Sequence, residues 1–240
     1  MNNIILEDGY NTDYIYSIVI SFFYSLNDIS KITVAQNVDV YYIQEYIKNK
    51  FIYPIQRGNS IEQRTINKFR LYLFNCGWSN ANILENMPVE IFYKFLINNI
   101  FGYYLCTTRN KYDNICLTND YIYDGNVNLS VMLEKWFIKN IEKFEQLPYI
   151  IPIHIDCKAK IDIMEQIKLP EQINSQDTIW TISSLICKND DGYYSIIINN
   201  DMLIAYSDKH IPSNWIIDLT NDNVKEDIMR TIKFVFYKMK

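Results

Sequence analysis

The sequence predicts an α+β fold, in which a helical part over residues 1–102 is followed by a β-rich part over residues 103–240. In the first part, apolar residues recur at spacings of three and four, the period of an amphipathic helix. In the second part, short segments rich in β-branched and aromatic residues are separated by turn signals, which is typical of strands. No low-complexity linker interrupts the chain, so we expect residues 1–240 to form a single domain with a cleft between its two parts.

The first predicted helix follows the stretch NTD, in which Asn11 and Thr12 are favourable N-cap residues. The apolar run from Tyr14 to Leu26 is long enough for a helix but shorter than the roughly 20 residues that cross a bilayer, so we expect a buried core helix and no membrane association. Asp13 then lies in the first helical turn, where the helix dipole favours a negative charge by about 0.3 to 1 kcal/mol. Taken alone, this aspartate is interpreted as a cap.

Three more helices are expected in the first part, over residues 39–51, 60–74 and 87–102. Gly77 is the expected stop of the second of these, because glycine accepts the left-handed conformation that ends many helices. The third has an apolar stripe that we expect to face the core, formed by Ile91, Phe92, Phe95, Leu96 and Ile100.

The second part is expected to contain short strands around one helix over residues 129–144. The expected strands cover residues 103–110, 114–125, 149–156, 178–188, 193–200, 201–208 and 231–240. Asp191-Gly192 predicts a tight turn between two of them. In the last strand, alternation places Ile232, Phe234 and Phe236 on one face. The acidic stretch 218–227 is expected to be a solvated connection.

Composition excludes several classes of function. A net charge of -5 and a pI near 5.1 leave no basic excess to displace counterions from phosphates, so no nucleic-acid partner is expected. The five cysteines are scattered without a CxxC pair, and the N-terminus lacks a signal-peptide pattern, which together predict an intracellular, cytoplasmic protein with reduced thiols. The 20 tyrosines, 12 phenylalanines and only 6 glycines suggest an AT-rich genome, such as that of a large DNA virus or a protist.

Six segments resemble, in their order along the chain, the conserved boxes of one known family. They are LEDGYNTDY (6–14), ENMPVEIF (85–92), LPYIIPIHIDCK (147–158), IKLPEQI (167–173), DDGYYSIII (190–198) and TIKFVFY (231–237). The first is similar to L-x-N-x-G-N-T-C-Y, the third to L-P-x-V-L-x-I-H-L-K-R-F, and the fifth to a glycine-histidine-tyrosine box. Together they resemble the ubiquitin-specific protease family of cysteine deubiquitinases, peptidase family C19.

The resemblance implies a papain-like cysteine protease fold shaped as a right hand. Residues 1–102 would form a helical thumb, and residues 103–240 an antiparallel palm sheet with reduced fingers. The family's fingers bind zinc through two CxxC pairs, whereas only Cys106 and Cys116 lie in the corresponding segment here. Because the chain departs from the family's pattern here, we expect no zinc, and we expect no other cofactor.

The catalytic residues of the family are replaced in this chain. Asp13 stands in the position that matches the nucleophilic cysteine, Tyr193 in that of the histidine, Ser207 in that of the orienting residue and Asp8 in that of the oxyanion helper. We call these four positions the relic site. A carboxylate is a poor acyl-transfer nucleophile, and a tyrosine with an ordinary pKa near 10 cannot accept a proton at neutral pH as histidine does. An acid at the fourth position would repel a developing oxyanion.

The predicted function is that of a catalytically inactive ubiquitin-specific protease-like protein. It would act as a binding or scaffold module for ubiquitin or another protein, within a viral assembly in the virion or host cytoplasm, or as a decoy in ubiquitin signalling. The alternative is an active deubiquitinating hydrolase that uses relocated residues. The expected positions of three residues argue against this alternative. Cys76 is expected at a helix C-terminus, where the dipole would raise a thiol pKa. His154 is expected to have a structural role in an apolar strand, and His210 to lie in an exposed turn.

Overall fold

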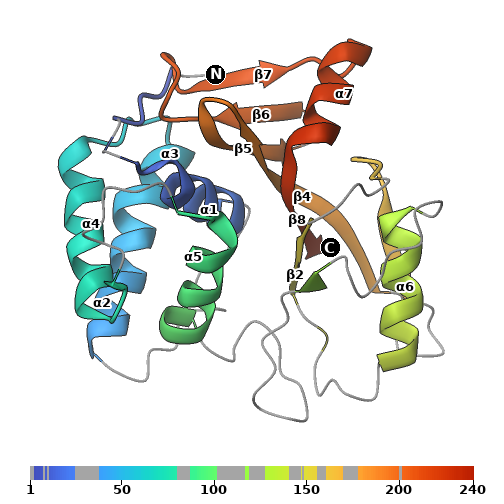
Figure 1. Cartoon of the computed structure of the whole chain (residues 1–240), viewed down its shortest axis with the longest axis horizontal. Coiled ribbons are helices and arrows are strands. Elements are labelled where there is room, and N and C mark those ends of the chain that lie inside the picture. Colours follow the sequence, from blue (N-terminus) through green and yellow to red (C-terminus); the bar gives the residue numbers. More distant parts are fainter. Residues whose placement is uncertain are drawn as a thin grey trace.

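The computed structural model describes residues 3–7, 9, 11–24, 38–79, 87–101, 117–118, 128–140, 147, 149–155, 161–169, 178–199 and 202–240. The first part is helical, as predicted (Figure 1). Its α-helices are α1 (Asp13–Phe23), α2 (Val38–Ile47), α3 (Tyr53–Gln56), α4 (Gln63–Asn75) and α5 (Val89–Leu96). Wide π-helical turns follow two of them, Lys48–Ile52 between α2 and α3 and Ile97–Phe101 after α5.

Helix α1 is the centre of this helical layer. All of its 11 residues are buried, because the α2–α5 helices surround it on one side and the sheet covers it on the other. The predicted stop of α4 is confirmed: Gly77 has a φ of +94°, and the Trp78 N–H donates to the Leu73 carbonyl 2.9 Å away. A membrane-spanning helix is absent from the described residues.

The second part forms an eight-stranded sheet, in the order β1-β2-β8-β4-β5-β6-β7, with β3 paired to β4 beside β5. The strands are β1 (Leu117–Thr118), β2 (Ile150–His154), β3 (Gln166–Leu169), β4 (Thr178–Asn189), β5 (Gly192–Asn199), β6 (Met202–Tyr206), β7 (Asn214–Ile217) and β8 (Ile232–Met239). All pairs are antiparallel except β1 with β2. The predicted α+β class with an antiparallel sheet is thus confirmed.

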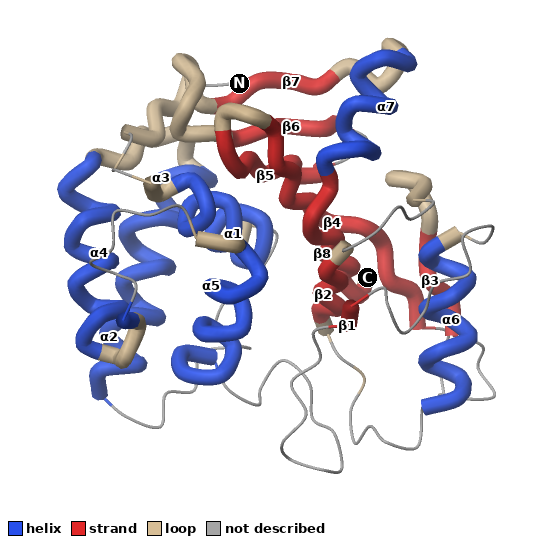
Figure 2. Tube along the Cα trace, in the orientation of Figure 1, coloured by secondary structure: helices blue, strands red, loops and turns tan. Residues whose placement is uncertain are grey.

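The sheet lies between two helical layers (Figure 2). On one face it packs against α1–α5 in a core that includes Phe234 and Phe236. On the other face it packs against α6 (Leu129–Asn140) and α7 (Asp222–Thr231) in a second core around Trp180. Because both faces of the central strands are buried, most residues of β4 and β8 are buried rather than alternately buried and exposed.

Three predictions about side-chain direction or local structure were wrong. In α5, Ile91 is 44% exposed and Tyr93 is buried in its place, since the helix turns a neighbouring face to the core. In β8, Ile232 joins the second core while Phe234 and Phe236 join the first, because register shifts interrupt the β4–β8 ladder. The expected solvated connection over residues 218–227 contains the start of α7, whose N-cap Asn221 accepts the Asn223 N–H at 3.1 Å.

Other predictions fall outside the described residues. The strand expected over 103–110 is among them, and of the strand over 114–125 only the two residues of β1 are described. The reduced fingers therefore stay a prediction, as does the single domain.

A short N-terminal segment, residues 3–7, joins the helical layer to the sheet. The Ile4 N–H donates to the Asn214 side-chain oxygen at 2.7 Å, and the Ser213 N–H donates to the Ile4 carbonyl at 2.8 Å. The carbonyl of the next residue, Ile5, accepts the Ile61 N–H, also at 2.8 Å. The segment thus bonds to β7 on one side and to the approach to α4 on the other.

Candidate functional site

Asp13 begins α1 and is buried, with only 1% of its surface exposed. The predicted first-turn position of Asp13 is confirmed, and Thr12 is the N-cap residue, as predicted. The Thr12 side chain makes no capping bond; its hydroxyl lies 2.7 Å from the Gly9 carbonyl and 3.0 Å from a carboxylate oxygen of Asp208. The start of α1 is therefore held by contacts to residues outside the helix.

The Asp13 carboxylate is bonded to the turn between β4 and β5. Its Oδ2 accepts the Tyr193 backbone N–H at 2.8 Å. The neighbouring Gly192 has a φ of +135°, and a Cβ at that residue would clash with Asp13 Oδ2 and lie 3.2 Å from its Cγ. Glycine is thus required both by the backbone conformation and by the approach of the carboxylate. Asp13 and Tyr193, two positions of the relic site, are brought into direct contact.

The Tyr193 side chain fills the space between β5 and α5. It is 5% exposed, its hydroxyl accepts the Val89 N–H at 3.4 Å, and the Lys188 ammonium lies 4.9 Å from its ring centroid. Burial raises the pKa of the Tyr193 hydroxyl above its usual value, although the Val89 N–H and Lys188 favour the ionised form. The phenol is therefore protonated at neutral pH and serves as a packed, hydrogen-bonded group at the N-terminus of α5.

Ser207 is buried and stabilises a local turn. Its Oγ accepts the Lys209 N–H at 3.1 Å, and its own N–H donates to the Ser213 carbonyl. The next residue, Asp208, contacts the start of α1, because its carboxylate accepts a hydrogen bond from the hydroxyl of the N-cap residue Thr12. The sequence analysis did not predict a role for Asp208. The signal in the sequence was that this acid directly follows Ser207, the position that matches the orienting residue of the family. Asp8, the fourth relic position, lies outside the described residues.

Two histidines and two cysteines that were considered for a relocated active site lie within the described residues. His154 on β2 packs on the Phe234 ring, with centroids 5.0 Å apart, and its Nε2 is 4.0 Å from a carboxylate oxygen of Glu90. His210 is exposed, as predicted, and its ring contacts Trp215. Cys187 is fully buried on β4, where burial raises its thiol pKa to about 12, and Cys76 is partly buried with a pKa raised by burial and by Asp39. Neither thiol is activated.

The remaining cysteines, Cys106, Cys116 and Cys157, lie outside the described residues. Within the described ranges, His, Cys, Asp and Glu side chains form no cluster able to hold a metal ion.

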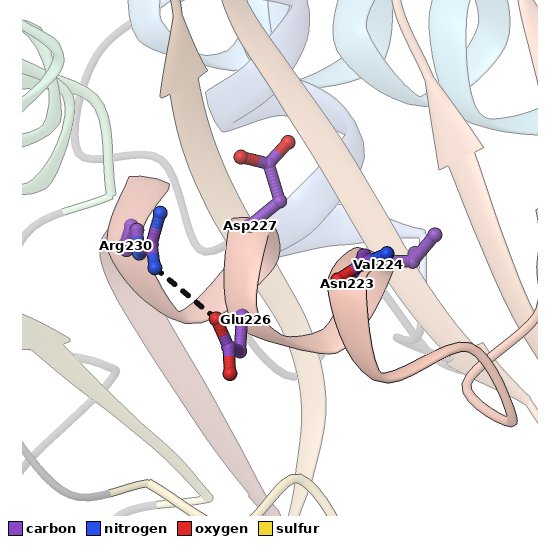
Figure 3. A pocket seen from close by; sticks show the side chains of 5 residues that line it. All are labelled: Asn223, Val224, Glu226, Asp227 and Arg230. Carbon is purple, nitrogen blue, oxygen red and sulfur yellow. Dashed lines mark hydrogen bonds and ion pairs between the residues drawn. The ribbon is translucent and has the colours of Figure 1, made fainter.

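A hollow of about 500 Å³ lies along α7, and none of its lining residues belongs to the relic site (Figure 3). Two acids and one base line it, and Arg230 donates to Glu226 one turn earlier at 3.1 Å. Such an i, i+4 pair on an exposed face contributes about 0.3 to 0.5 kcal/mol and is an ordinary surface feature.

Comparison with solved structures finds a related fold in the Saccharomyces cerevisiae Pan2 pseudoubiquitin hydrolase-RNA exonuclease module. The module in complex with A7 RNA matches with a TM-score of 0.59 at 10% sequence identity, over 100% of this chain and 55% of that one. The complex with AAUUAA RNA gives a TM-score of 0.51 at 10% identity, over 98% and 52% of the two chains. The fold is similar to that of a pseudoubiquitin hydrolase. This chain spans about half the length of those Pan2 chains.

No family model and no curated protein sequence matches the chain. At this level of identity the likeness to Pan2 shows the fold alone. It confirms, in a coarser form, the predicted fold, which is similar to that of a pseudoubiquitin hydrolase.

Proposed function

We propose that this protein is a catalytically inactive relative of the ubiquitin-specific proteases, which acts as a binding or scaffold module. The observation that carries the proposal is the bond from the Tyr193 N–H to the Asp13 carboxylate. It gives the residue in the nucleophile position a structural role. The likeness of the fold to a pseudoubiquitin hydrolase supports the same conclusion.

Acyl transfer requires a nucleophile, a base to take its proton and donors for the oxyanion. At the start of α1 the carboxylate of Asp13 accepts a backbone bond, and the neighbouring Tyr193 hydroxyl is protonated and packed against α5. A second acid, Asp208, accepts a hydrogen bond from the Thr12 hydroxyl, beside Asp13, at 3.0 Å. This arrangement fits a structural bond between α1 and the β4–β5 turn, and it does not fit acyl transfer.

The alternative, an active deubiquitinating hydrolase with relocated residues, is opposed by the raised thiol pKa values of Cys76 and Cys187. A ubiquitin probe with a thiol-reactive C-terminus tests it, with an active ubiquitin-specific protease as a positive control. We expect none of the five cysteines to be labelled. Labelling of any one, abolished by its Cys→Ser variant, would overturn the proposal of inactivity.

The proposed partner is a protein, with ubiquitin as the first candidate, in a viral assembly or as a decoy in ubiquitin signalling. Isotope-labelled ubiquitin titrated with this protein and followed by NMR tests this step. Amide shifts confined to the ubiquitin tail and its apolar patch would support a retained ubiquitin reader. Unchanged spectra at millimolar concentration would remove ubiquitin as the partner and leave the scaffold role with another protein.

We further propose that the module does not bind RNA, although the Pan2 module is described in complex with RNA. The net charge of -5 opposes phosphate binding. In fluorescence anisotropy with labelled A7 RNA at 50 mM salt, we expect no binding at micromolar protein. Salt-sensitive binding would contradict this proposal.

A further inference from the structure

Three buried polar side chains meet where α1, α4 and the turn that ends α4 come together. Tyr14 lies on α1, Arg70 on α4 and Trp78 directly after Gly77, with 0%, 7% and 5% of their surfaces exposed. The rings of Tyr14 and Trp78 both pack on the Phe92 ring of α5, at centroid distances of 5.2 and 5.4 Å. The two rings are thus held close together by α5.

The polar atoms of these side chains face one another without a direct hydrogen bond. Burial raises the pKa of the Tyr14 hydroxyl, and Trp78 and Arg70 lower it in part, because their N–H groups favour the ionised phenol. Both side chains therefore present N–H groups to the Tyr14 oxygen. Among the described residues, however, Tyr14 Oη, Arg70 Nε and Trp78 Nε1 have no hydrogen-bond partner, although all three atoms are buried. Buried polar atoms normally have a partner, which indicates a bound group between these three.

The charges around this place favour a neutral group. The Arg70 guanidinium donates through Nη2 to the Asn11 carbonyl at 2.6 Å, and in the described part of the chain no carboxylate forms an ion pair with it. An anion would neutralise this cation, but burial and the negative charge of Asp13 both raise the pKa of Tyr14, so a second negative charge here would be repelled. A water molecule carries no net charge and can both accept and donate hydrogen bonds.

We propose that Tyr14, Arg70 and Trp78 bind one internal water molecule. The water accepts hydrogen bonds from Arg70 Nε–H and Trp78 Nε1–H and donates one to Tyr14 Oη, which gives each of the three buried atoms a partner. About three hydrogen bonds is the usual number for a buried water. The site joins the start of α1 to α4 and to the turn that ends α4. It goes beyond the proposed function, because it requires neither a partner protein nor catalytic inactivity.

Water–protein NOE and ROE spectra of the protein with isotope-labelled tryptophan test the site. A long-lived internal water gives NOE and ROE cross-peaks of opposite sign, whereas fast surface hydration gives cross-peaks of the same sign. We expect opposite signs between water and the Trp78 indole N–H. The cross-peaks should persist in Tyr14→Phe, which excludes relay through the exchanging Tyr14 hydroxyl. Their absence from the unmodified protein, or their loss in folded Tyr14→Phe, would overturn the proposal.

Two arginine variants test the second donor. The cross-peak intensity should fall at least twofold in Arg70→Met, which removes the Nε–H, and stay unchanged in Arg64→Met, a matched change at an exposed arginine of the same helix. Equal intensities in the two variants would overturn the proposal.

A crystal structure of the unmodified protein provides a readout that does not depend on the variants folding. We expect an electron-density peak at about 2.7 to 3.2 Å from both Arg70 Nε and Trp78 Nε1. Crystals soaked in bromide should show no anomalous peak at this position. A bromide peak would assign the site to an anion, and a direct bond from Trp78 Nε1 to Tyr14 Oη would leave no place for a ligand. Either result would overturn the proposal.

Discussion

At the scale of single residues, the change of a nucleophile position to aspartate has a structural consequence. A carboxylate accepts a hydrogen bond from a backbone N–H well, whereas a thiol sulfur is a weak acceptor. A hydrogen bond to a charged group contributes about 1.5 to 3 kcal/mol to the free energy of unfolding. Asp13 uses this capacity to bond the β4–β5 turn, and Gly192 leaves room for it. The two residues are best understood as a pair.

Substitution of Asp13 and Gly192 tests whether they act as a pair. Asp13→Ala should lower the free energy of unfolding by about 1 to 3 kcal/mol, because the buried Tyr193 N–H loses its acceptor, and Asp13→Asn should cost less. Gly192→Ala should cost more than Gly77→Ala. Both require a strained φ, but only the first clashes with Asp13, while nothing lies within 4 Å of a Cβ at Gly77.

The double variant Asp13→Ala/Gly192→Ala should be more stable than the sum of the two single changes predicts, because the clash is gone. Urea denaturation of the variants gives the coupling energy. Strict additivity would contradict the pairing.

At the scale of elements, contacts far apart in sequence hold the layers together. Serines on the buried face of α1 and on the sheet exchange bonds with the facing backbone: Ser21 Oγ donates to the Leu185 carbonyl, and Ser195 Oγ to the Ser17 carbonyl. These bonds satisfy hydroxyls that burial would otherwise leave without partners. The N-terminal segment adds a second connection between β7 and α4.

Asn214 is the residue on which this second connection is easiest to test. Asn214→Ala should lower the free energy of unfolding by about 1 to 3 kcal/mol, since the buried Ile4 N–H loses its acceptor. Asn214→Asp retains an oxygen acceptor and serves as the matched control. Hydrogen exchange at the Ile4 and Leu6 amides should accelerate in the alanine variant only. Equal exchange in both variants would show that the segment is held by other contacts.

At the scale of the whole molecule, buried tyrosines make stability depend on alkaline pH. Burial raises the folded-state pKa of Tyr194, Tyr206 and Tyr237 well above 10, and negative charge on Glu165 and Asp162 adds to the shift at Tyr237. Such groups hold their protons more tightly in the folded than in the unfolded state. Their contribution to stability is fully present below about pH 10, the unfolded pKa, and is lost as pH rises towards the folded pKa.

We therefore expect the free energy of unfolding to fall above about pH 10, by about 1.4 kcal/mol per pH unit for each such group. Tyr237→Phe removes one group and should make the fall less steep. At pH 7 the same change should be nearly neutral or stabilising, since no described residue hydrogen-bonds to the buried Tyr237 hydroxyl. Denaturation curves from pH 7 to 11 measure both effects, and an unchanged slope in the variant would contradict the role of Tyr237.

The elements that the sequence predicted well are those with a strong local signal. Helices α1, α4 and α6 and strands β4, β5 and β8 have long apolar patterns, and Gly77 and Asp191-Gly192 are local stop and turn signals. Helix α7 was missed because its charged residues resemble a solvated loop, while its stability depends on the Asn221 cap and on Ile228 packing against the sheet. Strand β7 was missed because its short stretch NWII gains its pairing only beside β6.

The sequence by itself determined the helices and strands with strong local patterns and which side chains stand at the relic site, because both are properties of short stretches of chain. Only the tertiary structure decided what those side chains do. The bond between Asp13 and Tyr193 joins residues 180 positions apart, and that between Thr12 and Asp208 spans 196. No local pattern encodes such contacts, since they form only when α1 packs onto the sheet and brings the start of the helix against the β4–β5 turn.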